Sequence, residues 1–159
     1  MIDELSIRDA DYDCPRDRAA IVELLDMYAV EDSGTGNPLP PDVQRDLVTG
    51  LSEHPTSRVL LAWVDGRAVG IAVCFVGFST FAAKRLVNLH DFAVRPECRR
   101  QGIGRRLMQQ VEIWARELDC CKITLEVRHD NQAAQRLYRS YGFNDPGIAT
   151  HFWSKTLDS

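Results

Sequence analysis

Residues 86–107 read L-V-N-L-H-D-F-A-V-R-P-E-C-R-R-Q-G-I-G-R-R-L, and the architecture of the chain depends on them. The first nine residues are mostly apolar or β-branched, which predicts a strand. Pro96 ends that strand, because proline has no N–H to donate to a neighbouring strand. The turn R-R-Q-G-I-G at Arg99–Gly104 follows, and an amphipathic helix begins there. Since the first N–H groups of a helix have no partner inside it, this arrangement predicts an anion site.

The turn is strongly basic, with one acid, Glu97, beside its arginines. Its five arginines are Arg95, Arg99, Arg100, Arg105 and Arg106. A helix N-terminus stabilises an anion by only about 0.3–2 kcal/mol, so the arginines favour a multiply charged phosphate group. The turn is not a P-loop, because no Gly-Lys-Ser/Thr follows, and Leu107 stands at the third glycine of a dinucleotide-binding motif. An ordinary basic turn before a helix is the alternative interpretation.

Arg99-x-x-Gly102-x-Gly104 after L-H-D-F-A-V resembles the acetyl-CoA pyrophosphate motif of the GCN5-related N-acetyltransferases (GNAT). A second segment, residues 125–143, resembles the C-terminal motif of that family. Its matching positions are Asn131, Ala134, Leu137, Tyr138, Gly142 and Phe143. Residues 50–92 resemble, more loosely, the diamine acetyltransferase branch.

This resemblance implies an α/β fold, with a mixed and mostly antiparallel sheet of six to seven strands and about four helices. It also implies that the central strands splay apart. The length of 159 residues predicts that residues 1–159 form a single domain. Apolar periodicity gives elements in a compatible order. We expect strands at 5–8, 58–64, 69–78, 86–94, 123–127 and 148–156, and helices at 16–32, from Asp42, at 104–118 and at 131–141. Asp65-Gly66 predicts a hairpin turn.

The composition is that of a globular protein, with 45% hydrophobic and 26% charged residues. No apolar run reaches the roughly 18 residues that a membrane span needs. The five cysteines are scattered and odd in number, which argues against a disulfide framework. Together with an acidic N-terminus that lacks an apolar core, they predict a cytoplasmic protein. No Cys/His spacing in the sequence predicts a metal site. Residues 1–60 carry a net charge of −8 and residues 61–159 a net charge of +4. The basic part suits a polyanionic cofactor and the acidic part a cationic amine, whereas the overall acidity disfavours nucleic acid.

The resemblance implies acetyl-CoA as the cofactor and assigns its contacts. Backbone N–H groups of Phe92, Ala93 and Val94 are expected at the thioester carbonyl, and Asn131 at the pantetheine arm. The diphosphate is expected at Arg99, Arg100, Gln101, Gly102, Ile103, Gly104 and Arg105. Asn131 also suits a helix N-cap, and both roles are compatible. Gly142 is expected to end the last helix.

Tyr138 is the expected general acid, because the family places a tyrosine of this motif near the sulfur of the cofactor. The alternative is a core residue, since Ala134, Leu137, Tyr138 and Tyr141 share one helix face. A thiolate whose conjugate thiol has a pKa of about 8.5 is an acceptable leaving group even without a proton donor. The general acid is therefore expected to accelerate the reaction without being essential to it.

Two positions compete for the role of general base. Glu126 matches the base of the ribosomal-protein N-terminal acetyltransferases, but it also suits a solvated strand face. His90 and Asp91 are the rivals, predicted on opposite faces of the strand, with Asp91 beside Val87, Leu89 and Ala93. Burial there would raise the pKa of Asp91. His90 replaces an acid of the diamine branch, and its imidazole offers another proton acceptor or a relay through water.

The sequence therefore predicts an acetyl-CoA-dependent N-acetyltransferase that acts on a primary amine by direct attack. A small cationic amine, a diamine or an amino-acid-like amine is favoured over a peptide or protein N-terminus. A non-catalytic acyl-CoA-binding sensor is the alternative from another class. We expect no nucleic-acid or membrane partner, and a homodimer is compatible with the family resemblance.

Overall fold

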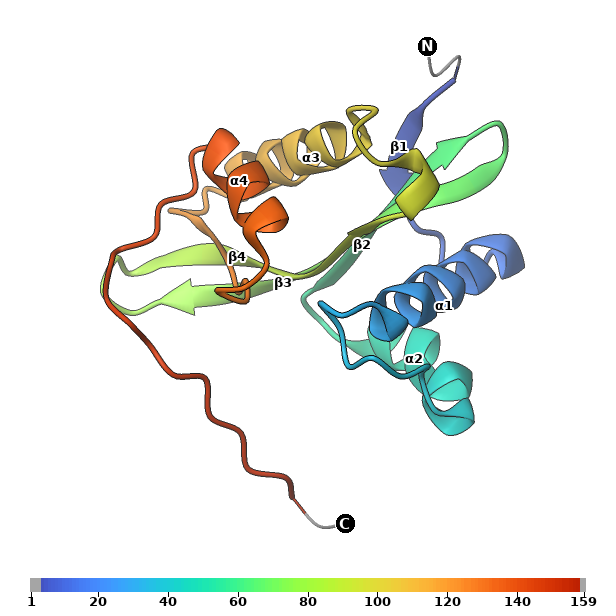
Figure 1. The fold of residues 1–159 in the computed structure, drawn as a ribbon, viewed down its shortest axis with the longest axis horizontal. Coiled ribbons are helices and arrows are strands. Elements are labelled where there is room, and N and C mark those ends of the chain that lie inside the picture. The colour runs from blue at the N-terminus through green and yellow to red at the C-terminus, as the bar shows by residue number, and fades with distance from the viewer. Residues whose placement is uncertain (1–3, 158–159) are drawn as a thin grey trace. The chain divides into compact units, whose positions relative to one another are not determined.

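The computed structural model describes residues 4–157, which divide into two compact units (Figure 1). The first unit extends through Arg128, and the second begins at His129. Each unit is described by itself below. The single domain expected over residues 1–159 stays a prediction.

Five strands of the first unit form one mixed sheet in chain order, as far as the described residues go. They are β1 (Ser6–Asp9), β2 (Ser57–Val64), β3 (Arg67–Ser79), β4 (Lys84–Val94) and β5 (Ile123–Leu125). Strands β1 to β4 pair antiparallel, and β5 pairs parallel to β4. The mixed α/β fold is confirmed, and the Asp65-Gly66 turn has the two positive φ values, 47° and 75°, that such a hairpin turn requires.

The expected count of six to seven strands is wrong, because residues 148–156 form no strand among the described residues. Large apolar side chains of this segment are exposed, among them Ile148 at 72% and Trp153 at 85%. The segment has β-forming residues, but propensity does not supply the neighbouring strand to which it must hydrogen-bond.

Helices cover both faces of the sheet in the first unit. They are α1 (Pro15–Val30), α2 (Pro41–Glu53) and α3 (Ile103–Glu117), with a short 3-10 helix at Pro96–Cys98. Figure 1 shows α1 and α2 on one side of the sheet and α3 on the other. Residues 59–63 of β2 are all buried, because both faces of the strand are covered.

The predicted start of α2 needs a correction. Asp42 was expected to cap the helix, but the helix begins at Pro41, and Pro40 is the N-cap residue. Proline suits the first helical position because its fixed φ is already helical and its missing N–H is not needed there. Asp42 lies in the first turn, where its charge complements the helix dipole.

A β-bulge interrupts the pairing of β3 and β4. Val73 lies opposite Asp91, whereas Cys74 lies opposite Leu89, so His90 is the extra residue of β4. The bulge reverses the alternation of side chains along β4. Asp91 therefore shares its face with Val73 rather than with Leu89, and the predicted separation of His90 and Asp91 onto opposite faces is wrong.

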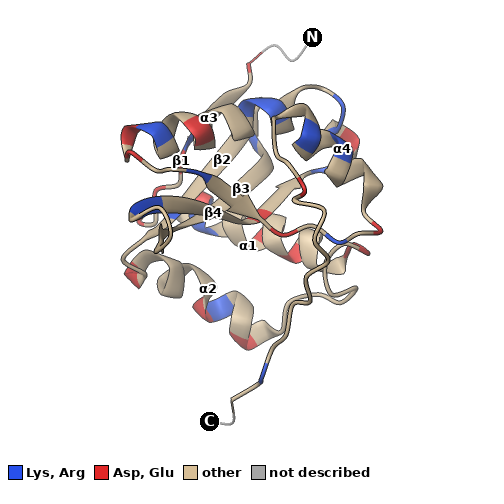
Figure 2. Cartoon of the chain, turned by 90° about the vertical axis from the view of Figure 1, so that its left-hand side faces the viewer, with Lys and Arg blue, Asp and Glu red and all other residues tan. Residues whose placement is uncertain are grey.

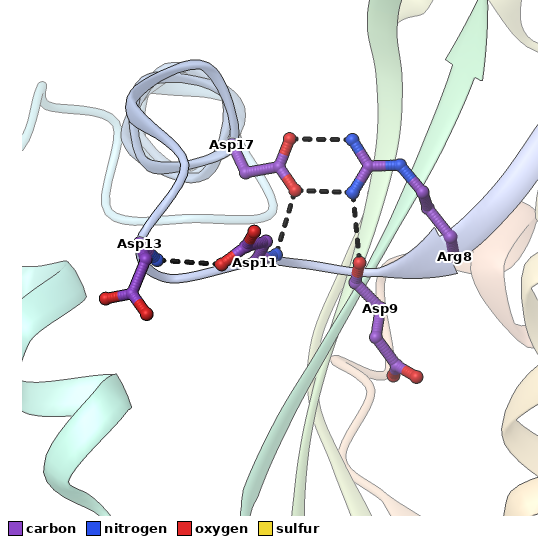
Figure 3. A network of polar contacts seen from close by, with 5 residues as sticks. All are labelled: Arg8, Asp9, Asp11, Asp13 and Asp17. Carbon is purple, nitrogen blue, oxygen red and sulfur yellow. Dashed lines mark hydrogen bonds and ion pairs between the residues drawn. The ribbon is translucent and has the colours of Figure 1, made fainter.

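Asp17 joins the start of α1 to β1 through a network of polar contacts (Figure 3). Its carboxylate is fully buried, accepts two hydrogen bonds from Arg8, and accepts a third from the backbone N–H of Asp11 at 2.8 Å. Arg8 holds the pKa of Asp17 below its usual value, mainly through the side-chain hydrogen bond.

The second unit contains α4 (Gln132–Ser140) and its two predicted ends. The side chain of Asn131 accepts a hydrogen bond from the N–H of Ala134, which confirms the N-cap. At the other end Gly142 has φ of 88°, its N–H donates to Arg139, and the N–H of Phe143 donates to Tyr138. This pattern is a Schellman motif, so the expected helix end at Gly142 is confirmed.

Candidate active site

The turn before α3 carries unusual backbone angles. Arg100 has φ of 61° and Gly102 has φ of 83°, so two residues of this short turn are left-handed. A non-glycine residue in that region stores about 1–2 kcal/mol, and such strain often marks a functional site. No side chain caps α3, whose N-cap residue is Gly102.

The space over this helix end is open. A Cβ placed on Gly102 would meet no described atom within 4 Å. The N–H groups of Ile103 and Gly104 belong to the first turn, where no helical carbonyl is available to them. The turn therefore has the shape and the donors that an anion requires. Figure 2 shows basic residues at this end of α3.

The arginines of the turn do not all face the same partner. Arg95 is buried; its Nε donates to the carbonyl of Ala68 at 2.7 Å, and its guanidinium pairs with Glu23. The interpretation of Arg95 as part of a cluster around the anion is therefore wrong. Arg99 pairs with Glu31, and its Nε donates to the carbonyl of Val94 at 2.9 Å.

Strand β4 continues beyond its pairing with β5. The last pair is Leu89 with Leu125, and residues 90–94 extend past it. The splay that the family resemblance implies would begin beyond this pair. The N–H of Arg95 donates to Val69 on β3, so by strand alternation the N–H of Ala93 faces β3 as well. The N–H groups of Phe92 and Val94 point the other way, toward the edge that β5 leaves.

Asp91 and His90 lie at the start of the length of β4 that extends beyond its pairing with β5. Burial raises the pKa of Asp91, as predicted, and the charge of His90 opposes that rise. Burial also raises the pKa of Tyr28 on α1, and the charge of Asp91 adds to that effect. Asp91 thus interacts electrostatically with a histidine and a tyrosine in a partly dehydrated setting, and a carboxylate with a raised pKa is suited to accept a proton.

Glu126 has a different environment. It is exposed and lies one residue beyond the end of β5. Nearby in sequence, Arg128 donates to the carbonyl of Asp32, at 3.0 Å. This exposed position at the end of a strand agrees with the interpretation of Glu126 as part of a solvated strand face. Its role as the general base stays a prediction.

Asn131 and Tyr138 belong to the second unit. Tyr138 is half-buried on α4, and its ring lies edge-on to Phe143 with centroids 5.8 Å apart. No residue of α4 is fully buried, so Tyr138 is not in a closed core within this unit. The catalytic role of Tyr138 and the pantetheine contact of Asn131 stay predictions.

A row of three rings, which the sequence does not predict, lies on the face of Asp91. His54 lies edge-on to Phe75 with centroids 4.8 Å apart, and Phe75 lies edge-on to His90 at 5.3 Å. His54 ends α2, Phe75 lies on β3 and His90 is the bulge residue, so the row joins three distant segments. No local sequence pattern predicts such a row, because the alternation of apolar residues along the strand does not reveal the bulge that turns His90 to this face.

Over residues 4–157, no three His, Cys, Asp or Glu side chains gather closely enough to hold a metal ion. Within the same residues, every helix is too short or too polar to cross a lipid bilayer.

Comparison with known proteins places this geometry in a family. The sequence model described as the acetyltransferase (GNAT) family matches residues 21–143. A putative [ribosomal protein bS18]-alanine N-acetyltransferase of Bacillus subtilis (strain 168) is 26% identical over 128 residues, which are 80% of this chain and 79% of the relative.

Two solved structures share the fold at low sequence identity. An aminoglycoside acetyltransferase from an uncultured soil metagenomic sample has a TM-score of 0.81 at 20% identity, covering 99% of this chain and 100% of the other. AAC(6')-Iy, solved with the bisubstrate analogue CoA-S-monomethyl-acetylneamine, has a TM-score of 0.79 at 16% identity, covering 96% of this chain and 99% of the other.

Proposed function

Because the chain belongs to the acetyltransferase (GNAT) family and is an acetyltransferase enzyme, we propose that it transfers the acetyl group of acetyl-CoA to a primary amine. The observation that carries this proposal is the open, uncapped N-terminus of α3 behind a left-handed glycine at position 102. The family resemblance assigns the coenzyme A diphosphate to this place, and its donors and open space suit such a group.

Residues of this chain would hold the cofactor at two places. The N–H groups of Ile103 and Gly104 would bind the diphosphate, and Asn131 would bind the pantetheine arm. When bound, acetyl-CoA supplies the thioester whose acetyl group is transferred. The N–H of Val94 would donate to the thioester carbonyl oxygen, which gains negative charge as the amine attacks.

The acceptor amine must lose a proton before it attacks. An amine of pKa about 10 is only about 0.1% neutral at pH 7, which is a free-energy cost of about 4 kcal/mol. We assign proton removal to Asp91, with His90 beside it. The raised pKa of Asp91 brings it closer to the working pH, where a general base is most effective.

The direct test is the release of free thiol from acetyl-CoA in the presence of a panel of primary amines. The panel contains monoamines, diamines, amino-acid esters and peptides with a free N-terminus. Amine-dependent thiol release with a matching acetylated product supports the proposal. Binding of coenzyme A without release for any amine would indicate the non-catalytic sensor instead.

A peptide N-terminus is the second candidate acceptor. The relative named as an alanine N-acetyltransferase of a ribosomal protein aligns with 80% of this chain, which supports that alternative. A peptide that begins with alanine separates the two candidates, because it offers an α-amine on a long polar chain. Preference for that peptide over every small amine would favour the second candidate.

The base assignment gives a prediction that does not depend on the acceptor. Asp91→Asn removes the acidic limb of the pH profile of kcat/KM, whereas Glu126→Gln and His90→Asn leave that limb in place. Loss of the limb in Glu126→Gln alone would reassign the base to Glu126.

The same Asp91 variant also changes stability with pH. Because burial raises the pKa of Asp91, the folded state binds a proton that the unfolded chain has released above about pH 4. The native carboxylate therefore lowers stability as the pH rises above about 4. Asp91→Asn is expected to be more stable than the native protein at pH 7 and equally stable below about pH 4, by thermal unfolding. A variant less stable at pH 7 would contradict the burial argument.

A further inference from the structure

Arg99 contacts two other segments of the first unit. Its Nε donates a hydrogen bond to the carbonyl oxygen of Val94 at 2.9 Å, and its Nη2 forms an ion pair with Glu31. Glu31 is the C-cap residue of α1, and Val94 is the last residue of β4. One guanidinium group therefore joins the end of a helix to the end of the strand at which the thioester is proposed to bind.

The contact with Val94 lies on the outer edge of β4. In an extended strand the N–H and the carbonyl of one residue point to the same edge. The N–H of Arg95 donates to Val69 of β3, so both polar groups of Val94 point away from β3. Arg99 thus holds the carbonyl of Val94 on the same edge as the Val94 N–H, which is proposed to donate to the thioester carbonyl oxygen.

This hydrogen bond restricts the direction of the Val94 N–H. The peptide group that follows Val94 is held at both of its polar atoms, by Arg99 at the carbonyl and by Val69 at the N–H. Strand β4 pairs with β5 only as far as Leu89, so among the described residues no neighbouring strand supports this edge at Val94. A donor stabilises a transition state best when it is already directed at the atom that gains charge. Arg99 supplies the support for that direction.

Arg95 and Arg99 attach the turn to α1 in the same manner. The Nε of Arg95 donates to the carbonyl of Ala68 at 2.7 Å, and its guanidinium pairs with Glu23 of α1. The charge of Arg99 is likewise balanced by Glu31, whose side chain is only 24% exposed. A diphosphate that drew Arg99 away would leave this carboxylate without its ion-pair partner, which is unfavourable. These contacts therefore favour a role for Arg99 at the strand over a role as an anion ligand.

We infer that Arg99 is a positioning residue, which directs the N–H of Val94 at the thioester carbonyl oxygen while Glu31 holds the guanidinium in place. This inference rests on the proposed function and adds two residues to its site. It differs from the contact with the diphosphate that the family resemblance implies for Arg99.

Two conservative substitutions separate these two roles of Arg99. Glutamine has its amide nitrogen at the chain position of the arginine Nε, so Arg99→Gln keeps the donor for Val94 and loses the charge. Lysine has a carbon at that position, so Arg99→Lys keeps the charge and loses the donor. We expect kcat to fall roughly tenfold or more in Arg99→Lys and to stay within about threefold of the native value in Arg99→Gln. The affinity for coenzyme A, measured by calorimetry, should stay within about threefold of the native value in both variants.

Glu31 provides a second and independent test. Glu31→Ala should lower kcat roughly threefold or more in the native background and leave kcat unchanged in Arg99→Gln, because the glutamine donor does not depend on the carboxylate. Glu97→Ala is the matched control, since Glu97 lies on the short 3-10 helix before Arg99 and pairs with the exposed side chain of Arg67. Its kcat should stay within about twofold of the native value.

The outcomes distinguish this inference from the proposed function. Weaker binding of coenzyme A to Arg99→Gln, with native affinity in Arg99→Lys, would place Arg99 at the diphosphate and overturn the inference while the proposed function stands. Native kcat in both variants, or an equal fall in both, would overturn it as well. A Tm that is lower in Arg99→Lys than in Arg99→Gln by more than about 4 °C would make Arg99 a residue of general stability instead. Absence of thiol release from the native protein with every amine overturns both.

Discussion

Tyr138→Phe is expected to lower kcat roughly ten- to a thousandfold, while the affinity for coenzyme A stays within about twofold. The phenolic hydroxyl would protonate the departing thiolate, and a positioned acid contributes about this much to a reaction. We do not expect a larger loss of turnover, because a thiolate whose conjugate thiol has a pKa of about 8.5 is an acceptable leaving group without protonation. Steady-state turnover with a good acceptor, together with calorimetry for coenzyme A, measures both quantities.

Tyr141→Phe is the matched control for this prediction. Tyr141 is the C-cap residue of α4, three residues after Tyr138, and the substitution removes the same hydroxyl. It lies outside the tyrosine position of the family motif, so its turnover should stay within about threefold of the native value. Equal turnover in the two variants and the native protein would show that Tyr138 is a packing residue, as the periodicity of α4 alone suggests.

Asp17→Asn is expected to lower the free energy of unfolding at pH 7 by about 3 kcal/mol. The substitution breaks a buried charge pair, which typically costs 3–5 kcal/mol, and Arg8 reduces this cost because its side chain is 46% exposed and can be rehydrated. For a chain of this length, about 3 kcal/mol corresponds to a fall in Tm of about 6–12 °C. Thermal unfolding followed by circular dichroism measures it.

The pH dependence of that loss has a definite sign. Arg8 depresses the pKa of Asp17 in the folded protein, so the stabilisation is complete above the unfolded pKa of about 3.9 and disappears as the pH falls through the folded pKa. The difference between native protein and Asp17→Asn should therefore be constant from about pH 5 to 7 and shrink below about pH 4. Asp13→Asn, an exposed change nearby, should alter stability by less than about 0.5 kcal/mol. A loss in Asp13→Asn equal to that in Asp17→Asn would remove the argument from burial.

The sequence predicts the local elements well because each depends on neighbouring residues. Asp65-Gly66 needs only two positive φ values to form its turn, and Asn131 caps α4 with its own side chain. Gly142 ends that helix for the same local reason. These features need no knowledge of distant contacts.

Features that depend on pairing between strands could not be predicted from the sequence alone. The bulge at His90 arises from the register between β3 and β4, so the faces of His90 and Asp91 were predicted wrongly. Residues 148–156 have the composition of a strand, but no described strand pairs with them. Both errors come from treating alternation as sufficient when a strand also needs a partner.

The basic turn shows a similar limit for charge. The sequence groups Arg95 with the arginines expected around the anion. In the structure its side chain is buried and contacts Ala68 and Glu23 instead. The features that indicate an anion site lie instead in the backbone: the left-handed Gly102 and the uncapped first turn of α3.

The most direct measurement is a calorimetric titration of the full chain with coenzyme A and, separately, with pantetheine, which lacks the diphosphate. We expect coenzyme A to bind at least a hundredfold more tightly than pantetheine, and Gly102→Val to lose most of that difference, because its side chain would be strained at a φ of 83° and would project into the open space over α3. No heat of binding for coenzyme A, or equal affinity for the two compounds, would contradict the assignment of the diphosphate to this turn.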